Sequence, residues 1–220
     1  MPDDAYRFAK GKKIQATGGE EVRLHRPLDF LMLADHAENL GVLSHLVAND
    51  GSVPRSEVSQ RWSQFLAKVA PLSEILNMET FEAFNRGSDS LAQGKGAWQA
   101  DYGVDSRFQY MVWEEVIANA ERHNDPGMFT AFIGYEWSAR VPGSNIHRNV
   151  LFEGGADQTR QVIPISRFDS VDPEDLWTYL QDYKDRTKGK VLAIPHNGNM
   201  SSGQMFKPVS YTHLTLPTKA

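Results

Sequence analysis

The sequence contains no cysteine, which excludes disulfide bonds and metal sites built from thiolates. Any bound metal ion must therefore be held by histidine, aspartate or glutamate. These harder ligands favour ions such as zinc, manganese or iron over ions that prefer sulfur. The absence of cysteine does not identify the compartment, so the cytoplasm and the periplasm both stay open.

The chain also lacks long apolar runs and an excess of positive charge. No stretch approaches the ~20 apolar residues that cross a bilayer, and Met1 is followed by a polar segment instead of a signal peptide. The 23 basic residues are outnumbered by 28 acidic residues, which gives a net charge of -5. We therefore expect no nucleic-acid partner and no membrane span.

The two ends of the sequence are unusual for a complete α/β domain. Residues 2–9 have the proline and early acidic residues of a helix start, but no strand precedes them. We therefore expect that the chain begins inside a domain. Residues 209–218 resemble the translation of a transposase adapter used in DNA library preparation. We interpret 1–208 as a partial domain and 209–220 as a sequencing artefact; the alternative is a strand followed by a proline turn.

Apolar and helical patterns alternate along the rest of the chain. Four short apolar runs are typical of strands covered on both faces: 28–34, 129–134, 148–152 and 190–194. Helical spacing of apolar residues lies between them, at 39–47, 56–69, 108–120 and 172–188. This alternation predicts an α/β fold with a parallel sheet or barrel. A helical insertion at about 51–103 is expected to form a cap or side lobe.

Ionisable side chains follow three of the four predicted strands. Asp35 and His36 follow the first, Glu136 follows the second and His196 follows the fourth. In parallel α/β folds, the carboxyl ends of strands converge at the active site. His147 instead precedes its apolar run, so it reaches the same place only if that strand is antiparallel or if the loop before it crosses the mouth.

Each of these residues also has a purely structural interpretation. A single histidine after a strand is commonly a hydrogen-bonded loop residue, and Asp35 could cap the following helix. Glu136 could pair with Arg140 or Arg148 at the surface. The recurrence of such groups at successive strand ends favours metal binding, because charged groups there need partners. Two further histidines lie within or at the end of helical patterns, where we expect structural roles: His45 and His123.

Four ordered motifs resemble a bacterial family related to PHP, the polymerase and histidinol phosphatase superfamily, namely domain-of-unknown-function family 3604. The motifs are Arg-Pro-Leu-Asp-Phe-Leu at 26–31 with Asp-His-Ala-Glu at 35–38, Ile-Gly-Tyr-Glu-Trp-Ser at 133–138, His-Arg-Asn-Val-Leu-Phe at 147–152, and Ile-Pro-His-Asn-Gly-Asn at 194–199. The resemblance implies an incomplete, distorted (β/α)7 TIM-like barrel with up to three divalent ions at its mouth.

The resemblance also implies a role for each matched residue. Glu136 would bridge two ions, and His147 and His196 would complete the second. His36 would bind a third ion, and Asp35 would be a ligand or an orienting group. Glu136, His196 and Asp35 are accordingly the candidate catalytic residues.

The implied activity is metal-dependent hydrolysis of a small-molecule phosphoester by a metal-activated water. Two family motifs are not found: the opening His-x-His and the closing Asp-x-His. We therefore expect weak metal binding and little activity from this fragment. A non-catalytic metal-binding scaffold or sensor is the alternative function.

Overall fold

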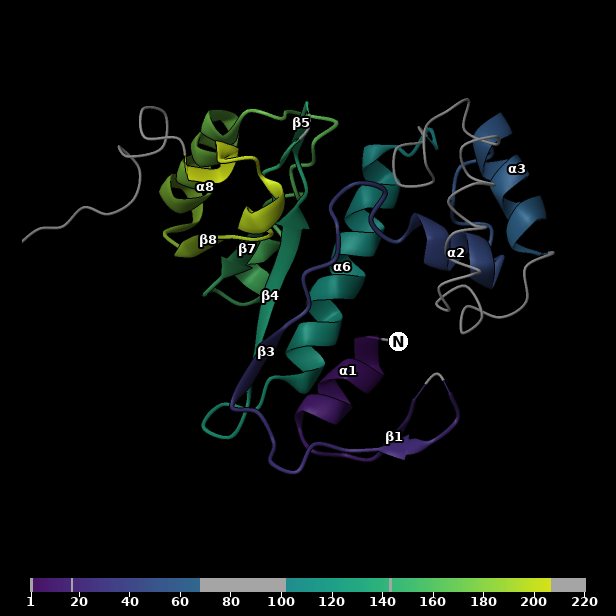
Figure 1. Ribbon diagram of the computed structural model, residues 1–220, viewed down its shortest axis with the longest axis vertical. Coiled ribbons are helices and arrows are strands. Elements are labelled where there is room, and N and C mark those ends of the chain that lie inside the picture. The colour runs from purple at the N-terminus through teal and green to yellow at the C-terminus, as the bar shows by residue number, and fades with distance from the viewer. Residues whose placement is uncertain (1, 17, 68–101, 143, 207–220) are drawn as a thin grey trace, which may run out of the picture.

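The computed structural model describes residues 2–16, 18–67, 102–142 and 144–206 (Figure 1). The fold is mixed α/β, as expected. Its described helices are α1 (Pro2–Ala9), α2 (Val42–Ala48), α3 (Glu57–Leu66), α6 (Ser106–His123), α7 (Ala156–Thr159) and α8 (Pro173–Thr187), with short 3-10 helices at Gly198–Met200 and Gln204–Phe206. Its strands are β1 (Ile14–Gln15), β2 (Glu21–Val22), β3 (Phe30–Met32), β4 (Thr130–Trp137), β5 (Arg140–Val141), β6 (Ser144–Asn145), β7 (Arg148–Phe152) and β8 (Val191–Pro195).

The main sheet has the strand order β3-β4-β7-β8. Strands β3 and β4 are parallel, but β7 runs antiparallel to both β4 and β8. The prediction of a parallel sheet is therefore wrong for β7. The two small hairpins, β1-β2 and β5-β6, were not predicted. In the part of the chain that is described, the sheet stays open and does not close into a barrel.

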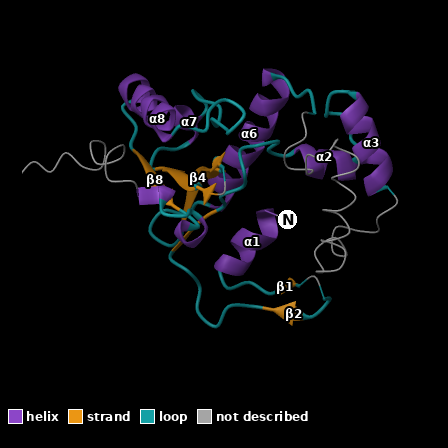
Figure 2. Cartoon of the chain, turned by 45° about the horizontal axis from the view of Figure 1, so that its top comes forward, coloured by secondary structure: helices purple, strands orange, loops and turns teal. Residues whose placement is uncertain are grey.

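One face of the sheet packs against helices and forms the main core. Alternate residues of β4 point to this face, including Ile133, Tyr135 and Trp137, which are at most 3% exposed. Helix α6 covers them with Trp113 and Ile117, which lie four residues apart on one helix face. Figures 1 and 2 show α6 running alongside β4, with α1 packed next to α6.

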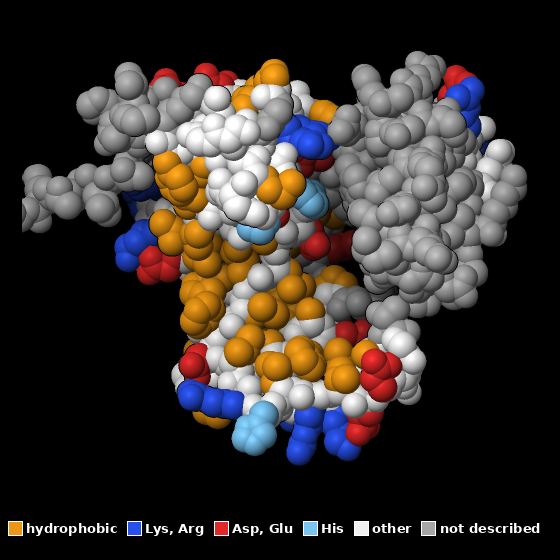
Figure 3. Space-filling view, viewed as in Figure 1, with side chains coloured by type: hydrophobic (Ala, Val, Ile, Leu, Met, Phe, Trp, Pro, Cys, Tyr) orange, Lys and Arg blue, Asp and Glu red, His pale blue; other side chains and the backbone are white. Residues whose placement is uncertain are grey.

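The opposite face of the sheet is open at its edge strands. Phe30 on β3 is 62% exposed, and Leu192 and Ile194 on β8 are also exposed. The prediction that these strands are covered on both faces is therefore wrong for β3 and β8 in the described structure. Figure 3 shows hydrophobic side chains gathered over the β3 region of this face.

Side-chain caps and a left-handed residue stabilise the ends of the two longest helices. The Asp172 side chain accepts a hydrogen bond from the Glu174 amide at the start of α8, and Asp105 does the same for Phe108 at the start of α6. At the end of α8, Lys188 adopts a left-handed conformation with φ 57°. No helix of the described residues has the length and apolar character needed to cross a bilayer.

A second core lies under α2, α3 and the start of α6. Its largest members are Trp62 and Tyr102, which are fully buried, and Phe108, which is 4% exposed. This core includes both ends of the predicted insertion at 51–103. Residues 68–101 of that insertion lie outside the described residues, as does the predicted artefact at 209–220.

His45 and His123 both make structural contacts. The two ring nitrogens of His45 lie 2.6 Å from Asp50 and 3.3 Å from Glu115, which joins α2 to α6. His123 lies 2.8 Å from Asp3 and stacks on Tyr6. These contacts agree with the structural roles expected for both histidines.

Acid sensitivity is expected at Asp50. Hydrogen bonds from Ser52, and a further one with His45, lower the pKa of Asp50 from 3.8 to about 2. The stabilisation is therefore fully present above pH 3.8 and is lost as the pH falls through about 2. We expect Asp50→Asn to have a lower free energy of unfolding than the natural chain at neutral pH. This difference in free energy should become smaller below about pH 4. Chemical unfolding at a series of pH values tests this, with Asp29→Asn at an exposed carboxylate as the control. A difference in free energy of unfolding that does not change with pH would contradict this prediction.

Gly134 allows β4 to approach its neighbours closely. A Cβ atom at this position would lie 2.1 Å from Met32 Sδ and 2.5 Å from the Val150 carbonyl oxygen. Because the carbonyl belongs to a paired strand, it cannot move away easily. We expect Gly134→Ala to lower the free energy of unfolding by roughly 1–3 kcal/mol, measured by denaturant titration. Gly198→Ala, where the nearest atom is 3.6 Å away, is the matched control and should be nearly neutral.

Candidate functional site

Backbone pairing places His36 beside Glu136. Glu136 lies near the end of β4, and its amide donates to the Asp35 carbonyl over 2.8 Å. The Ala37 amide donates to the Glu136 carbonyl over 2.9 Å. The parallel pairing of β3 and β4 therefore continues beyond β3 as an isolated bridge between His36 and Glu136.

The antiparallel direction of β7 brings His147 to the same edge of the sheet. Arg148 at the start of β7 pairs with Trp137 at the end of β4 and with Pro195 at the end of β8. The His196 amide then donates to the His147 carbonyl over 2.9 Å. Of the two alternatives for His147, an antiparallel strand or a loop that crosses the mouth, the structure shows the antiparallel strand.

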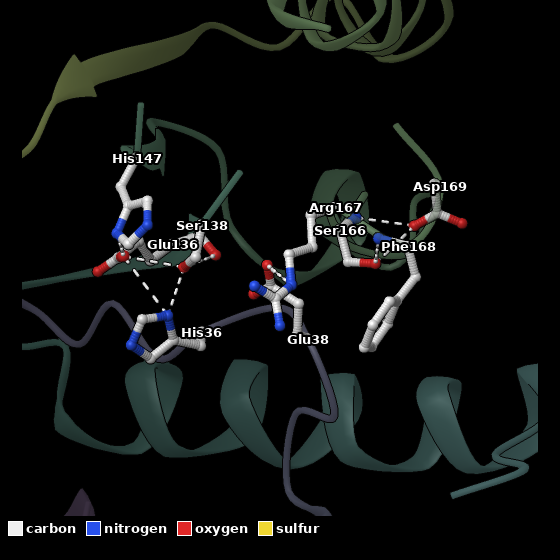
Figure 4. Close-up of polar contacts among 9 residues, drawn as sticks. All are labelled: His36, Glu38, Glu136, Ser138, His147, Ser166, Arg167, Phe168 and Asp169. Atoms are coloured by element: carbon white, nitrogen blue, oxygen red, sulfur yellow. Dashed lines mark hydrogen bonds and ion pairs between the residues drawn. The ribbon is translucent and has the colours of Figure 1, made fainter. Parts of the chain in front are cut away.

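Three imidazoles lie near the Glu136 carboxylate, and Figure 4 shows two of them, those of His36 and His147. His147 Nδ1 lies 2.9 Å from Oε1, and His36 Nδ1 lies 3.5 Å from the same oxygen. His196 Nε2 lies 3.6 Å from Oε2. Glu136 is buried at 6% exposure, His147 is buried at 7%, and the His36 and His196 side chains are open to solvent. Glu136 and His147 therefore form the buried part of the cluster, and His36 and His196 form the part that solvent reaches.

Ser138 is a further member that was not predicted. Its hydroxyl donates to Glu136 Oε1 over 2.8 Å and also contacts His36 Nδ1. Residues two positions apart in a strand lie on the same face, so the position of Ser138 relative to Glu136 could have indicated its place in the cluster. The hydroxyl connects His36 to Glu136 and limits the rotation of both side chains.

The surroundings of Glu136 favour its charged form. Burial raises the pKa of Glu136, but the interactions with His147 and Ser138 and the nearby imidazoles outweigh it. The net pKa lies below the ordinary value of 4.5. Glu136 is therefore an anion at neutral pH and can bind a cation without first releasing a proton.

The distances between the donor atoms lie close to those between ligands of one metal ion, but do not match them. Two ligands bound at ~2.1 Å with angles near those of a tetrahedron or octahedron lie about 3.0–3.4 Å apart. The three separations from Glu136 are 2.9, 3.5 and 3.6 Å. The contact of His147 Nδ1 lies outside hydrogen-bond geometry, and its buried Nε2 has no hydrogen-bond partner among the described residues. Within that same part of the chain, no group of three or more His, Asp or Glu side chains is arranged so that it could hold a metal ion.

Asp35 interacts with the cluster only weakly: burial raises the pKa of its carboxyl, and the charge of His36 acts in the opposite direction. It is exposed, and only its backbone is seen to contact Glu136 among the described interactions. Burial, with a further contribution from the Asp35 charge, raises the pKa of Tyr6 to about 12. The carboxylate of Asp35 therefore lies within electrostatic range of the α1 side of the fold. Its predicted role as ligand or orienting group remains a prediction.

The alternative that Glu136 forms a surface ion pair with Arg140 or Arg148 does not hold, because Glu136 is buried. Arg148 donates to the Met205 carbonyl over 3.2 Å and lies over the Trp177 ring. A different ion pair lies beside the cluster, between Glu38 and Arg167. Glu38 belongs to the 35–38 motif, whereas nothing in the sequence marked Arg167.

The family model for a protein of unknown function, DUF3604, matches residues 1–218, and the chain belongs to this family. No curated protein matches the chain. No solved structure matches it either. The membership in domain-of-unknown-function family 3604 that the four motifs predicted is therefore confirmed.

Removing the Ser138 hydroxyl should raise the pKa of Glu136. The hydroxyl donates to the carboxylate and so stabilises its charged form. We expect Ser138→Ala to shift the Glu136 titration to higher pH, measured by carbon-13 NMR of the side-chain carboxyl groups. Ser170→Ala, at an exposed hydroxyl bound to Asp175, is the control and should leave that titration in place. An unchanged Glu136 titration in Ser138→Ala would contradict the assignment.

Proposed function

We propose that this protein is a metal-dependent hydrolase of the PHP type that acts on a small-molecule phosphoester. The observation that carries the proposal is the convergence of three imidazoles on one buried carboxylate. His36, Glu136, His147 and His196 would hold divalent zinc, manganese or iron ions, up to three in number. Asp35 would act as a ligand or orienting group beside them.

The protein groups prepare this site before any ion binds. Glu136 is already ionised, and Ser138 fixes one of its oxygens. Neutral imidazoles supply the remaining donors and need a second partner to fix their tautomers. Ions bound here would lower the pKa of a water from ~16 towards 7 and neutralise a phosphoryl oxygen. His36 and His196 line the accessible side, where a substrate would approach.

The position of the site in the sheet supports a barrel-type architecture. The carboxyl ends of β3, β4 and β8 and the start of β7 meet at the Glu136 edge. Active sites of β/α barrels lie at the carboxyl ends of their strands. Glu136 shares its sheet face with Phe132 and, across the register, with Met32, because side chains alternate along strands. We propose that this apolar face belongs to the interior of a distorted (β/α)7 barrel.

A non-catalytic scaffold or sensor that binds metal is the alternative. It needs the same ligands, so metal binding alone does not separate the two functions. Turnover of a generic aryl phosphate by the protein does separate them. Metal-dependent turnover that is lost on chelation supports the hydrolase, and bound metal without turnover favours the scaffold.

Metal affinity tests the site itself. We expect titration calorimetry with manganese or zinc to show binding that weakens at least about tenfold in Glu136→Gln and in His147→Gln, because each loses a direct ligand. Glu153→Gln is the matched control, since Glu153 is an exposed carboxylate paired with Lys190, which directly precedes β8. Equal affinities in Glu136→Gln and Glu153→Gln would contradict the proposed metal site.

A further inference from the structure

Arg148 is a buried arginine that directly follows the proposed ligand His147, and the proposed metal site gives it no role. Because successive side chains of a strand point to opposite faces of the sheet, Arg148 points away from Glu136 and toward the helices. Arg148 is 4% exposed, and its guanidinium carbon lies 5.0 Å from the centre of the Trp177 ring on α8. Its Nη2 donates a hydrogen bond to the Met205 carbonyl over 3.2 Å. Arg148 therefore joins β7 to α8 and to the chain that follows β8.

Arg148 is in contact with both ends of the segment 196–204. Its backbone lies in register with Pro195, the last residue of β8, in the antiparallel pair of β7 and β8. Its side chain holds the Met205 carbonyl just beyond the other end of the segment. Closing a loop costs chain entropy, and an anchor at each end restricts the conformations that the loop can adopt. Figure 1 shows this segment in yellow next to the β5-β6 hairpin, which it contacts at β6.

The segment between these two anchors is held together by short-range hydrogen bonds. The Met200 amide donates to the Asn197 carbonyl over 2.9 Å, and the Gln204 amide donates to the Ser201 carbonyl over 2.8 Å. The hydroxyl of Ser201, a residue that is 2% exposed, donates to the Gly198 carbonyl over 2.7 Å. The segment is therefore one compact unit, so a constraint at its far end acts on its first residue.

That first residue is His196. Its amide donates to the His147 carbonyl over 2.9 Å, whereas its ring makes no hydrogen bond with the other described residues and is 42% exposed. The next residue, Asn197, has φ 58°, a left-handed conformation that residues other than glycine adopt infrequently. The backbone at 196–197 therefore determines where the His196 ring lies, which is 3.6 Å from Glu136.

The core does not need a guanidinium at this position for its stability. Removing a guanidinium from water costs free energy, which the Met205 carbonyl and the Trp177 ring offset. Apolar side chains of similar size can often replace buried charged groups without loss of stability. An apolar side chain cannot, however, donate to the Met205 carbonyl. The specific effect of Arg148 is therefore to hold that carbonyl in place.

We propose that Arg148 is a positioning residue that fixes the segment 196–204 and thereby holds the His196 imidazole beside Glu136. This inference rests on the proposed function, in which His196 is a metal ligand and a catalytic residue. Arg148 itself lies on the other face of the sheet and contacts neither the ion nor the substrate. It acts on the site through the backbone that connects Met205 to His196.

Amide hydrogen exchange of the full chain, followed by NMR, tests the positioning without metal. We expect Arg148→Met to speed exchange of the His196 and Gln204 amides at least about tenfold, because the segment loses its anchor. The Glu153 amide, which donates to the Lys190 carbonyl at the other end of the β7-β8 pair, should keep its rate. Arg186→Met is the matched control, because Arg186 also donates to a backbone carbonyl over 3.2 Å, and it should leave all three rates unchanged.

The pattern of exchange rates decides between positioning and general stability. Equal acceleration of all three amides in Arg148→Met, or no acceleration at His196, overturns the proposal. Trp177→Leu removes the ring beside the guanidinium and keeps the arginine. It should show the same pattern at a smaller size, about threefold, and it gives the answer if Arg148→Met does not fold.

Manganese affinity, measured by calorimetry in a double-mutant cycle, tests the link to His196. We expect Arg148→Met to weaken manganese binding about tenfold in the natural chain and in His36→Gln. In His196→Gln it should have no further effect, because the ligand through which it acts is already lost. Equal losses in the two backgrounds overturn the proposal. A natural chain that binds no manganese would contradict the proposed function, and the exchange rates would still decide whether Arg148 positions His196.

Discussion

The candidate site depends on one buried carboxylate. Glu136 reaches its position through strand pairing on both sides, with the chain before α2 on one side and β7 on the other. A lone buried carboxylate is costly, and the imidazoles and the Ser138 hydroxyl that surround it reduce this cost. Any rearrangement that moved β4 by one residue would turn Glu136 toward Trp113 and the helices, because alternate residues face opposite sides of the sheet.

The sequence predicted the elements of the fold better than their directions. The strand at Arg148–Phe152 and the helix at Pro173–Thr187 were located closely, since apolar periodicity and helix-capping residues are local signals. The antiparallel pairing of β7 was left open, because strand direction is fixed by tertiary packing and not by composition. The exposure of Phe30 and Ile194 was missed for a similar reason: an apolar run does not indicate which face has a neighbour.

Local sequence context identified some residues of the candidate site but not others. His36, Glu136, His147 and His196 were selected from their places at strand ends, and the structure brings all four together. Asp35 has the same sequence context, yet its side chain makes no described contact with Glu136, because successive side chains point in different directions. Ser138 and the Glu38–Arg167 pair depend on contacts between distant segments, so local patterns could not assign them.

The order of the strands has a consequence for how the site assembles as the chain folds. β4 and β7 are joined by a short connection that contains only the β5-β6 hairpin, so Glu136 and His147 meet through contacts that are near in sequence. His36 lies about a hundred residues before Glu136 and must close a much longer loop, which is slower and entropically more demanding. We therefore expect Glu136 and His147 to come together before His36 joins them.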